Sequence, residues 1–274
     1  MNNQQPPISL LFPLYKSKPH LPNLLKQVAL LKDLDCEIIF SDRHCYDDTI
    51  QMLQNAFQND KRCSFLACHD ELNWVGHYNL LMQLATGKYF CWVPHDDDYE
   101  PGYFSKLVAI LDRNPKAVLA FGTMKVIGDT NWTKPNHSIF KRENQFPYSA
   151  AHYVRLLVSG LLGIAFRGVY LRAKILDKKL LICENEKVKT HQDIYWLFAL
   201  ILNGQFIFDE SISCTKWFQS GTAHDGWNKT HFITNNPAAL RLVRRYLLGS
   251  SLNLFQKTYI YLLLRTYLVV RRKS

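Results

Sequence analysis

Three consecutive carboxylates, Asp96 to Asp98, follow an apolar run rich in aromatic residues, Tyr89 to Val93. Such a run is typical of a buried strand, and Pro101 then favours the start of a helix over Gly102 to Leu111. Like charges at the end of a buried strand repel one another and must be solvated or neutralised. A divalent cation would neutralise them, because Mg²⁺ and Mn²⁺ prefer carboxylate oxygens as ligands. The alternative is a solvated acidic turn in which an aspartate caps the helix.

A second candidate for chemistry is Asp193, which follows His191 and Gln192 at the start of the apolar helical pattern Ile194 to Leu202. The positive end of the helix dipole keeps a carboxylate at this position ionised and able to accept a proton. The competing interpretation is an ordinary acidic residue in the first turn of a helix.

Strand and helix patterns alternate through the first hundred residues. The predicted strands are Ile8–Phe12, Cys36–Ser41, Arg62–Cys68 and Lys88–Pro94, and the predicted helices are Leu21–Leu34, Asp47–Asn59 and Val75–Ala85. This alternation predicts an α/β fold, with a Rossmann-like, mainly parallel sheet flanked by helices. Ligands of such sheets bind beyond the carboxyl ends of the strands. Pro13, Tyr15, Asp42 and the three carboxylates all follow strand ends, so we expect them to share one edge of the sheet.

The first strand is not followed by a glycine-rich dinucleotide fingerprint or by a P-loop. A bound phosphate would therefore depend strongly on a metal ion.

The second half of the sequence is less regular. Its predicted strands are Ala117–Gly122, Lys125–Gly128, Ile164–Leu171 and Gln205–Asp209, and its predicted helices are Ala150–Val158 and Ile194–Leu202. Two polar segments, Asp129–Tyr148 and Thr215–Asn228, are predicted to be long loops. Loops of this length in a compact domain often bind a ligand or cover a site. From Pro237 onward the pattern predicts basic amphipathic helix.

The composition restricts the classes of function. The chain has 274 residues, of which 47% are hydrophobic, and a formal net charge of +10. These values indicate a globular protein that meets anionic partners. The segment Arg241–Lys273 contains basic residues interleaved with Leu, Tyr and Val and has no acidic residue. This pattern favours a membrane surface over nucleic acid, and the alternative is that the segment packs on the rest of the protein.

Other sequence features concern localisation. Met1–Pro7 lacks the pattern of a signal peptide, and the apolar run Tyr259–Val270 is interrupted by Arg265 and too short to cross a bilayer. The seven cysteines include no Cys-x-x-Cys pair, which fits reduced thiols in the cytoplasm and gives no support for a zinc site. We therefore expect a cytoplasmic protein that also associates peripherally with the inner face of the membrane.

Five segments in order resemble the family 2 glycosyltransferases of the GT-A fold. They are Ile8–Tyr15, Ile39–Asp42 followed by Asp47–Thr49, Asn79–Phe90, His95–Pro101 and His191–Asp193. The resemblance spans residues 8 to 224. It implies a nucleotide-sugar-binding half at residues 1–125, an acceptor-binding and catalytic half at 126–235, and a basic amphipathic helical tail at 236–274.

The resemblance also implies an activity. An enzyme of this family in polysaccharide or cell-envelope biosynthesis would transfer a sugar from a nucleotide-sugar donor, expected to be UDP-linked, to a glycan or lipid-linked glycan. The transfer would invert the anomeric centre by a direct displacement assisted by Mn²⁺ or Mg²⁺. The alternative is a non-catalytic nucleotide-sugar-binding protein on the same fold. Two departures from the family pattern favour that alternative: Gln192 stands where a glutamate is usual, and the segment Trp217–Thr222 lacks the usual histidine.

The resemblance assigns a role to each candidate site residue. Pro13 and Tyr15 would line the nucleotide pocket, Asp42 would bind the base, and His77 would lie by the diphosphate. Asp96 and Asp97 would contact the ribose or the donor sugar, and Asp98 would bind the metal. Asp193 would be the general base, and Trp217 would stack on the acceptor sugar. For His77 the alternative is a helix-surface residue, and for Trp217 it is a core residue.

Overall fold

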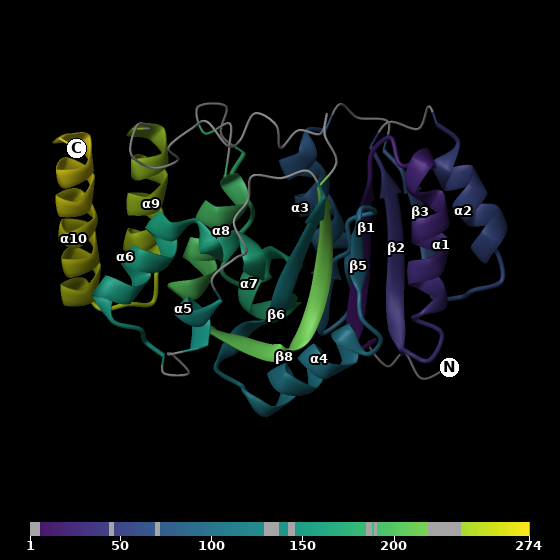
Figure 1. Ribbon diagram of the computed structural model, residues 1–274, viewed down its shortest axis with the longest axis horizontal. Helices are drawn as coiled ribbons and strands as arrows, with labels where there is room; N and C mark the ends of the chain where they lie inside the picture. The colour runs from purple at the N-terminus through teal and green to yellow at the C-terminus, as the bar shows by residue number, and fades with distance from the viewer. Residues whose placement is uncertain are drawn as a thin grey trace.

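The computed structural model describes residues 6–43, 47–68, 72–128, 137–141, 146–184, 188, 191–218 and 237–273. Within these residues one curled sheet of eight strands is flanked by helices, and its strand order is β3-β2-β1-β4-β7-β6-β8-β5 (Figure 1). The predicted α/β fold class is therefore confirmed. The sheet continues without a break from the first predicted half of the chain into the second, and the boundary near residue 125 stays a prediction.

The first four strands are parallel, and all the residues of the innermost one, β1, are buried. They are β1 (Ile8–Leu14), β2 (Cys36–Asp42), β3 (Cys63–Ala67) and β4 (Tyr89–Trp92). The segments that connect them are η1 (Lys18–His20), α1 (Leu21–Ala29), α2 (Thr49–Phe57) and α3 (Trp74–Leu84). The chain moves outward from β1 to β3 and then returns to the other side of β1 as β4. This reversal makes the β1–β4 boundary the switch point at which a parallel sheet opens a crevice for ligands.

The other four strands mix directions. They are β5 (Asp97–Tyr99), β6 (Ala117–Gly128), β7 (Val169–Leu171) and β8 (Gln205–Phe218). Strand β7 is antiparallel to β4 and β6, β5 is antiparallel to β8, and β6 is parallel to β8. The helical segments of this part are α4 (Tyr103–Arg113), α5 (Ser138–Lys141), α6 (Ala150–Ser159), η2 (Leu161–Arg167), α7 (Arg172–Leu176) and α8 (Gln192–Ile201).

Several predicted boundaries in this part are wrong. The last two of the three carboxylates form the short strand β5, and the two strands predicted between Ala117 and Gly128 are one. Residues 215–218 belong to β8, whereas the rest of the predicted loop, 219–228, lies outside the described residues, as does most of the loop predicted at 129–148. Only the end of the run Ile164–Leu171 is a strand, because its first residues complete the 3₁₀ helix η2.

An irregularity in the β6–β8 pairing explains why the strand predicted at Gln205–Asp209 ends too early. The register shifts between Gly122, which pairs with Asp209, and Thr123, which pairs with Ser213. The bulge brings the Ile212 carbonyl so close to Gly122 that a Cβ at that position would collide with it. Because the bulge interrupts the alternation of side chains along β8, the sequence pattern breaks at Asp209 although the strand continues.

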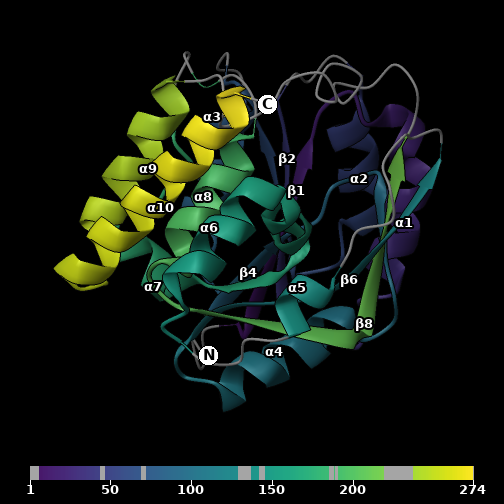
Figure 2. The ribbon, with the colours of Figure 1, turned by 60° about the vertical axis from the view of Figure 1, so that its left-hand side comes forward.

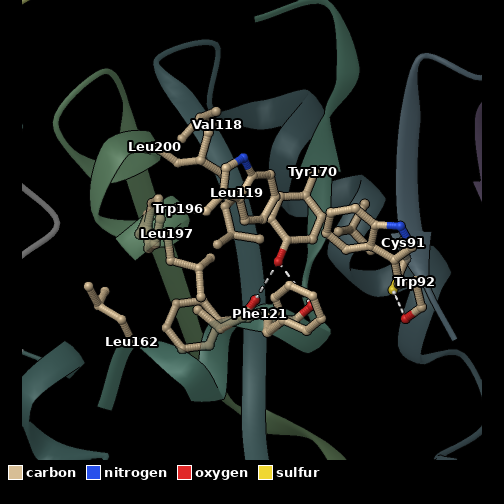
Figure 3. Packing of buried hydrophobic residues seen from close by; sticks show 14 of the residues in the cluster. Cys91, Trp92, Val118, Leu119, Phe121, Leu162, Tyr170, Trp196, Leu197 and Leu200 are labelled. Atoms are coloured by element: carbon tan, nitrogen blue, oxygen red, sulfur yellow. Dashed lines mark hydrogen bonds between the residues drawn. The ribbon is translucent and has the colours of Figure 1, made fainter. Parts of the chain in front are cut away.

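An aromatic cluster joins the two parts of the sheet. The Trp92 ring of β4 lies 5.4 Å from the Tyr170 ring of β7, 5.2 Å from the Trp196 ring of α8 and 5.0 Å from the Phe166 ring of η2 (Figure 3). All these side chains except that of Phe166 are almost completely buried. The cluster fixes the start of α8, which carries Asp193, relative to the end of β4, which leads to the carboxylates.

Two C-terminal helices complete the fold, α9 (Pro237–Gly249) and α10 (Leu254–Lys273). They stand at the opposite end of the molecule from β3 (Figure 1), where α9 packs on α8 and α10 packs on α6 (Figure 2). Their inner faces bury Leu242, Val243, Leu247, Ile260, Leu264 and Leu268. This face agrees with the packing interpretation of the basic segment. In the described part of the chain, no helix combines the length and the apolar character needed to cross a membrane.

Candidate functional site

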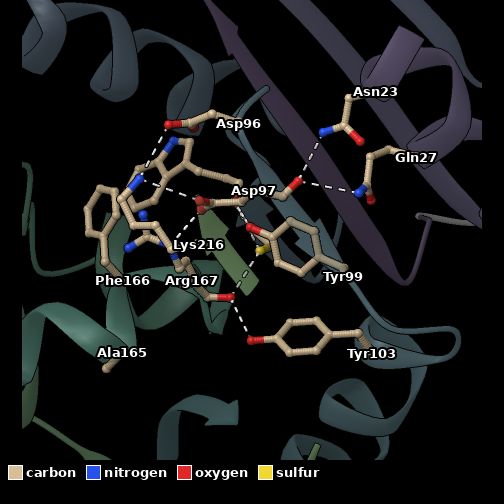
Figure 4. A network of polar contacts seen from close by, with 12 residues as sticks. Asn23, Gln27, Asp96, Asp97, Tyr99, Tyr103, Ala165, Phe166, Arg167 and Lys216 are labelled. Carbon is tan, nitrogen blue, oxygen red and sulfur yellow. Dashed lines mark hydrogen bonds and ion pairs between the residues drawn. The ribbon is translucent and has the colours of Figure 1, made fainter. Parts of the chain in front are cut away.

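Helix α1 holds the segment that follows β4. The Asn23 amide donates hydrogen bonds to the backbone carbonyls of His95, at 3.0 Å, and Asp97, at 3.3 Å (Figure 4). One turn later, the Gln27 amide donates to the Asp97 carbonyl at 3.3 Å and to the Asp98 Oδ1 atom at 2.9 Å. These bonds hold the backbone of the segment at His95 and Asp97 and orient the Asp98 carboxylate.

Two cations enclose Asp97, the middle carboxylate. Its Oδ2 atom accepts a hydrogen bond of 2.6 Å from Arg167 Nε, and its side chain has no exposed surface. Lys216 Nζ lies 3.5 Å from Asp97 Oδ1 and 3.4 Å from Asp96 Oδ2. The Tyr103 hydroxyl donates to the Arg167 carbonyl at 3.1 Å and thereby steadies the arginine (Figure 4). The geometry therefore makes Asp97 the centre of a buried ion-pair network.

Asp96 belongs to the same network but is more open, because a quarter of its side chain is exposed. Burial by itself would raise the pKa of Asp96. The positive charge of Lys216, together with that of Arg167, outweighs burial and lowers the pKa below its usual value. Asp96 is therefore an ionised carboxylate at neutral pH.

Asp98 points away from the two cations and toward Trp217. The Trp217 Nε1 atom donates a hydrogen bond of 2.7 Å to Asp98 Oδ2. In the antiparallel β5–β8 ladder Asp98 pairs with Thr215, so Trp217 is its diagonal neighbour on the same face. The Trp217 side chain is 41% exposed, so it is not a core residue. Its ring lies beside the three carboxylates Asp96–Asp98, which we call the acidic segment.

The loops after β1 and β4 are connected by hydrogen bonds. The Tyr15 backbone N–H donates to Ser17 Oγ at 2.9 Å, and Ser17 Oγ lies 2.7 Å from His95 Nδ1. The His95 ring also stacks on the His20 ring at 4.2 Å. Burial lowers the pKa of His95 to about 4, so its ring is neutral at neutral pH and bonds to Ser17 without adding a charge.

Asp42 lies at the end of β2, where it pairs with Leu14 of β1. Burial, followed by the charge of Asp47, raises the pKa of Asp42 to about 6. The neighbouring Ser41 hydroxyl lies 2.8 Å from Nε2 of His77, and burial lowers the pKa of that histidine to about 4. His77 is therefore a buried, neutral side chain next to the Asp42 strand rather than a residue of the helix surface. Pro13 is also buried in β1.

Arg43 follows Asp42 directly and was not anticipated from the sequence. Its guanidinium lies 4.3 Å from the centre of the Tyr15 ring, which is close enough for a cation–π interaction. Its Nε atom is buried and has no hydrogen-bond partner among the described residues. The half-exposed Tyr15 ring and this guanidinium together form one wall at the ends of β1 and β2.

Asp193 occupies the first turn of α8. Burial raises its pKa, an effect that the charge of Arg167 opposes, and its Oδ1 atom is buried without a hydrogen-bond partner among the described residues. The neighbouring Gln192 amide donates to the Cys183 carbonyl at 3.3 Å, a bond that an ionised glutamate could not make. Burial raises the pKa of the Tyr78 phenol, and the charges of Asp96 and Asp193 both add to that rise. Asp193 and the acidic segment therefore face the same part of the molecule.

The sequence contains a signal for Arg167 and Lys216, the two cations that were not predicted as site residues. Arg167 stands alone in the apolar run Ile164–Leu171, and Lys216 stands alone in the alternating run that ends β8. A single charge within a buried pattern has to be paired with an opposite charge. The sequence does not show which carboxylates the two cations meet, because that depends on the β5–β8 pairing and on η2.

The expected metal site does not fit the contacts of these residues. Over the described ranges, no three His, Cys, Asp or Glu side chains are grouped so that they could hold a metal ion. Asp96 and Asp97 face Lys216 and Arg167, and both Asp98 oxygens already accept hydrogen bonds from Gln27 and Trp217.

Comparison with known proteins identifies relatives of this fold. The profile described as Glycosyl transferase family 2 matches residues 9–175. The crystal structure of S. aureus TarS 1-349 in complex with UDP-GlcNAc is similar with a TM-score of 0.72 and 16% identity, over 94% of this chain and 71% of that one. The mannosyltransferase PcManGT from Pyrobaculum calidifontis, in complex with GDP-Man and Mn²⁺, is similar with a TM-score of 0.57 and 11% identity, over 97% and 86% of the two chains. No curated protein sequence matches the chain.

Proposed function

The chain belongs to glycosyl transferase family 2, and on this premise we propose that it transfers a sugar from a UDP-linked donor to a hydroxyl group of a glycan or lipid-linked glycan. The main support is the placement of ionisable groups at one edge of the sheet. Asp42 ends β2, Asp96 follows β4 beside the switch point, and Asp193 faces the same region from α8. This is the edge at which a parallel sheet binds its ligand.

The nucleotide would bind over β1 and β2. The Asp42 carboxylate would accept a hydrogen bond from N3–H of uracil, and the Tyr15 ring would cover the base or the ribose. The Arg43 guanidinium, which lies over Tyr15, would add positive charge toward the diphosphate. His77 would act through Ser41 by holding the end of β2 in place. TarS was crystallised with UDP-GlcNAc and with UDP, and these structures support a uridine donor here.

The donor sugar and the acceptor would meet between Asp96 and Trp217. Asp96 is ionised and partly open, which suits a hydrogen bond to a hydroxyl group of the ribose or the sugar. The exposed Trp217 ring offers an apolar face to a pyranose, and Asp98 orients the ring through its bond to Nε1. This role for Asp98 agrees with its contacts better than the predicted role as metal ligand.

The chemical step would be a direct displacement at the anomeric carbon C1. As the acceptor oxygen forms its bond to C1, Asp193 removes the hydroxyl proton, and the bond between C1 and the phosphate oxygen breaks to release UDP. A single displacement of this kind inverts the configuration at C1. The raised pKa of Asp193 makes its carboxylate a stronger base than an exposed aspartate.

A divalent ion remains a prediction for this protein. The PcManGT complex contains Mn²⁺, and Mn²⁺ or Mg²⁺ is what the family resemblance implies. The contacts of the three carboxylates do not form a metal site as they stand, and no step of the proposed displacement depends on a metal.

The test is release of UDP from a panel of UDP-sugars, with glycan and lipid-linked acceptors, by the parent and by Asp193→Asn. We expect the substitution to lower kcat by roughly 10²- to 10⁴-fold, the usual contribution of a general base, while the affinity for UDP is unchanged. If the parent binds UDP but releases none from any donor in the panel, the non-catalytic binding protein becomes the better interpretation.

We also propose that the outer face of α9 and α10 binds the inner surface of an anionic membrane, which would place the enzyme beside a lipid-linked acceptor in the cytoplasm. The exposed apolar side chains of these helices include Leu248, Leu254, Phe255, Tyr259, Leu262, Val269 and Val270. Exposed arginines lie on the same two helices, and residues 237–273 contain no acidic residue. Apolar area together with positive charge is the combination that holds a helix at an anionic bilayer.

Vesicle co-sedimentation tests this surface in the full chain. The parent should bind vesicles containing phosphatidylglycerol and not vesicles of phosphatidylcholine alone. The double variant Leu254→Ser/Phe255→Ser should lose most of this binding, because these side chains are 76% and 79% exposed. As a matched control, Leu30→Ser/Leu84→Ser removes one exposed apolar group directly after α1 and one at the end of α3, and this variant should bind like the parent. Equal binding by all three proteins would contradict the proposal.

A further inference from the structure

Lys216 lies beside Asp96 and Asp97, whose negative charges need a cation to balance them. Lys216 is directly opposite Asp97 in the antiparallel β5–β8 ladder, and its side chain is only 6% exposed. Its ammonium group is 3.4 Å from Asp96 Oδ2 and 3.5 Å from Asp97 Oδ1 (Figure 4). Two carboxylates therefore share this one positive charge, and both belong to the segment from which the sequence predicts metal binding.

The charges of this network are already balanced. Arg167 binds the other oxygen of Asp97, so two cations face two carboxylates in a site with little exposed surface. A divalent ion added to this arrangement would leave uncompensated positive charge where solvent is largely excluded, which is strongly unfavourable. If Lys216 were neutral or absent, the same carboxylates would carry excess negative charge and would attract a metal.

The backbone holds the ammonium group in place. Strand β8 pairs with both β5 and β6, and α1 anchors the backbone of the acidic segment through Asn23 and Gln27. A positive charge fixed in this way can stabilise negative charge that develops on a leaving diphosphate, and it needs little rearrangement to do so. An ammonium group also offers several donors, which suit carboxylate and phosphate oxygens alike.

We propose that the Lys216 ammonium takes the place of the divalent cation in this site, so that the protein binds a nucleoside diphosphate without a metal ion. The inference rests on the proposed function for the identity of the ligand. The exclusion of the metal by Lys216 does not depend on that function and can be measured separately.

Two measurements on the full chain test the two parts. Electron paramagnetic resonance of added Mn²⁺ reports free ion directly, and isothermal titration calorimetry measures UDP binding in EDTA and in Mn²⁺. The parent should leave the Mn²⁺ signal unchanged and should bind UDP in EDTA within about twofold of its affinity in Mn²⁺. Lys216→Met should bind Mn²⁺, and its UDP affinity should be about tenfold or more lower in EDTA and largely restored by Mn²⁺.

Two further variants test whether the changes seen in Lys216→Met come from altered folding. Lys106→Met removes an exposed lysine that lies 3.7 Å from Glu100, on the helix that follows the acidic segment, and should behave like the parent in both measurements. Lys216→Met/Asp96→Asn removes one charge of each sign and should bind Mn²⁺ less tightly than Lys216→Met. Thermal unfolding supplies a second readout, since Mn²⁺ should raise the Tm of Lys216→Met and leave that of the parent unchanged.

Each contrary result has a distinct meaning. Binding of Mn²⁺ by the parent, or UDP binding that disappears in EDTA and returns with Mn²⁺, would overturn the inference and restore the predicted metal site. If Lys216→Met binds no more Mn²⁺ than the parent does, the lysine does not exclude a metal, and the inference is also wrong. Absence of UDP binding under every condition would instead count against the proposed function, while the Mn²⁺ measurement would still decide the role of Lys216.

Discussion

At the scale of single residues, Asp42 combines a proposed binding role with an unfavourable environment. Burial raises its pKa to about 6, so the folded protein binds a proton at this site more tightly than the unfolded chain does. Stability from this group is therefore present at low pH and is lost as the pH rises from the unfolded pKa, about 4, to about 6. The ionised carboxylate is nevertheless the stronger acceptor for a hydrogen bond from uracil N3–H.

This conflict predicts opposite effects of Asp42→Asn on stability and on binding. At pH 7 the variant should have a higher Tm than the parent, and the difference should vanish near pH 4. The affinity of the parent for uridine should fall as the pH is lowered through about 6, whereas the weaker affinity of the variant should not change there. Uridine is the suitable probe because, unlike UDP, it has no phosphate that titrates in this range. A pH-independent affinity of the parent would show that Asp42 does not bind the base.

Arg167 supports a second prediction at this scale. Arg167→Met leaves the fully buried Asp97 carboxylate without its closest cation, at 2.6 Å in the parent. Breaking a buried ion pair from one side costs about 3–5 kcal/mol, and urea unfolding should show a loss of this size. Arg167→Met/Asp97→Asn should recover part of the loss, because no buried charge is then left unpaired. A single variant as stable as the parent would show that Lys216 alone is sufficient for Asp97.

The site was predictable from the sequence only in part. The three carboxylates and Asp42 could be identified because acidic residues at the ends of apolar runs are conspicuous, and Asp193 could be identified through the family resemblance. Their partners could not be assigned, because Arg167 and Lys216 reach them only through η2 and β8. The individual contacts of each carboxylate depend on these partners, so they could not be derived from local sequence.

At the scale of elements, the pairing of β6 with β8 depends on Gly122. Gly122→Ala would place a methyl group against the Ile212 carbonyl, so the two strands would have to separate. We expect a loss of about 1–3 kcal/mol or more, the usual cost of overpacking a core, measured as a lower midpoint in urea. The control is Gly249→Ala at the end of α9, where a Cβ would meet nothing within 4 Å. Similar stability of both variants would mean that the bulge adapts easily.

The quality of the prediction differed between elements for a physical reason. Strands β1, β2 and β4 are buried along almost their whole length, so each is a mainly apolar run that its own sequence reveals. Strand β8 is interrupted by its bulge and carries a buried lysine, and β5 consists of residues that usually form turns. These two strands form because β8 pairs with both β5 and β6. Pairing between segments that are far apart in the sequence cannot be predicted from the local pattern of residues.

At the scale of the whole molecule, the two C-terminal helices are part of the folded structure. They bury apolar side chains against α6, α8 and one another, among them Leu242, Val243 and Leu264. A fully buried side chain of this kind contributes about 1.5–3 kcal/mol, and the total stability of a domain is only about 5–15 kcal/mol. A chain ending at residue 235 should therefore fail to fold stably, with loss of the cooperative thermal transition by circular dichroism. A truncated chain with an unchanged transition would show that these helices are accessory.

The bond between Ser17 and His95 has a consequence for how relatives of this protein diverge. Ser17 is bonded to the backbone of Tyr15, in the loop after β1, and His95 directly precedes the carboxylates. The two positions are 78 residues apart in sequence and form one contact. If a relative has an aspartate in place of His95, the residue at position 17 must donate a hydrogen bond to a charged group. An apolar residue at either position leaves the polar side chain at the other position without its hydrogen-bond partner. Among homologues these two positions should therefore change together, as a covarying pair.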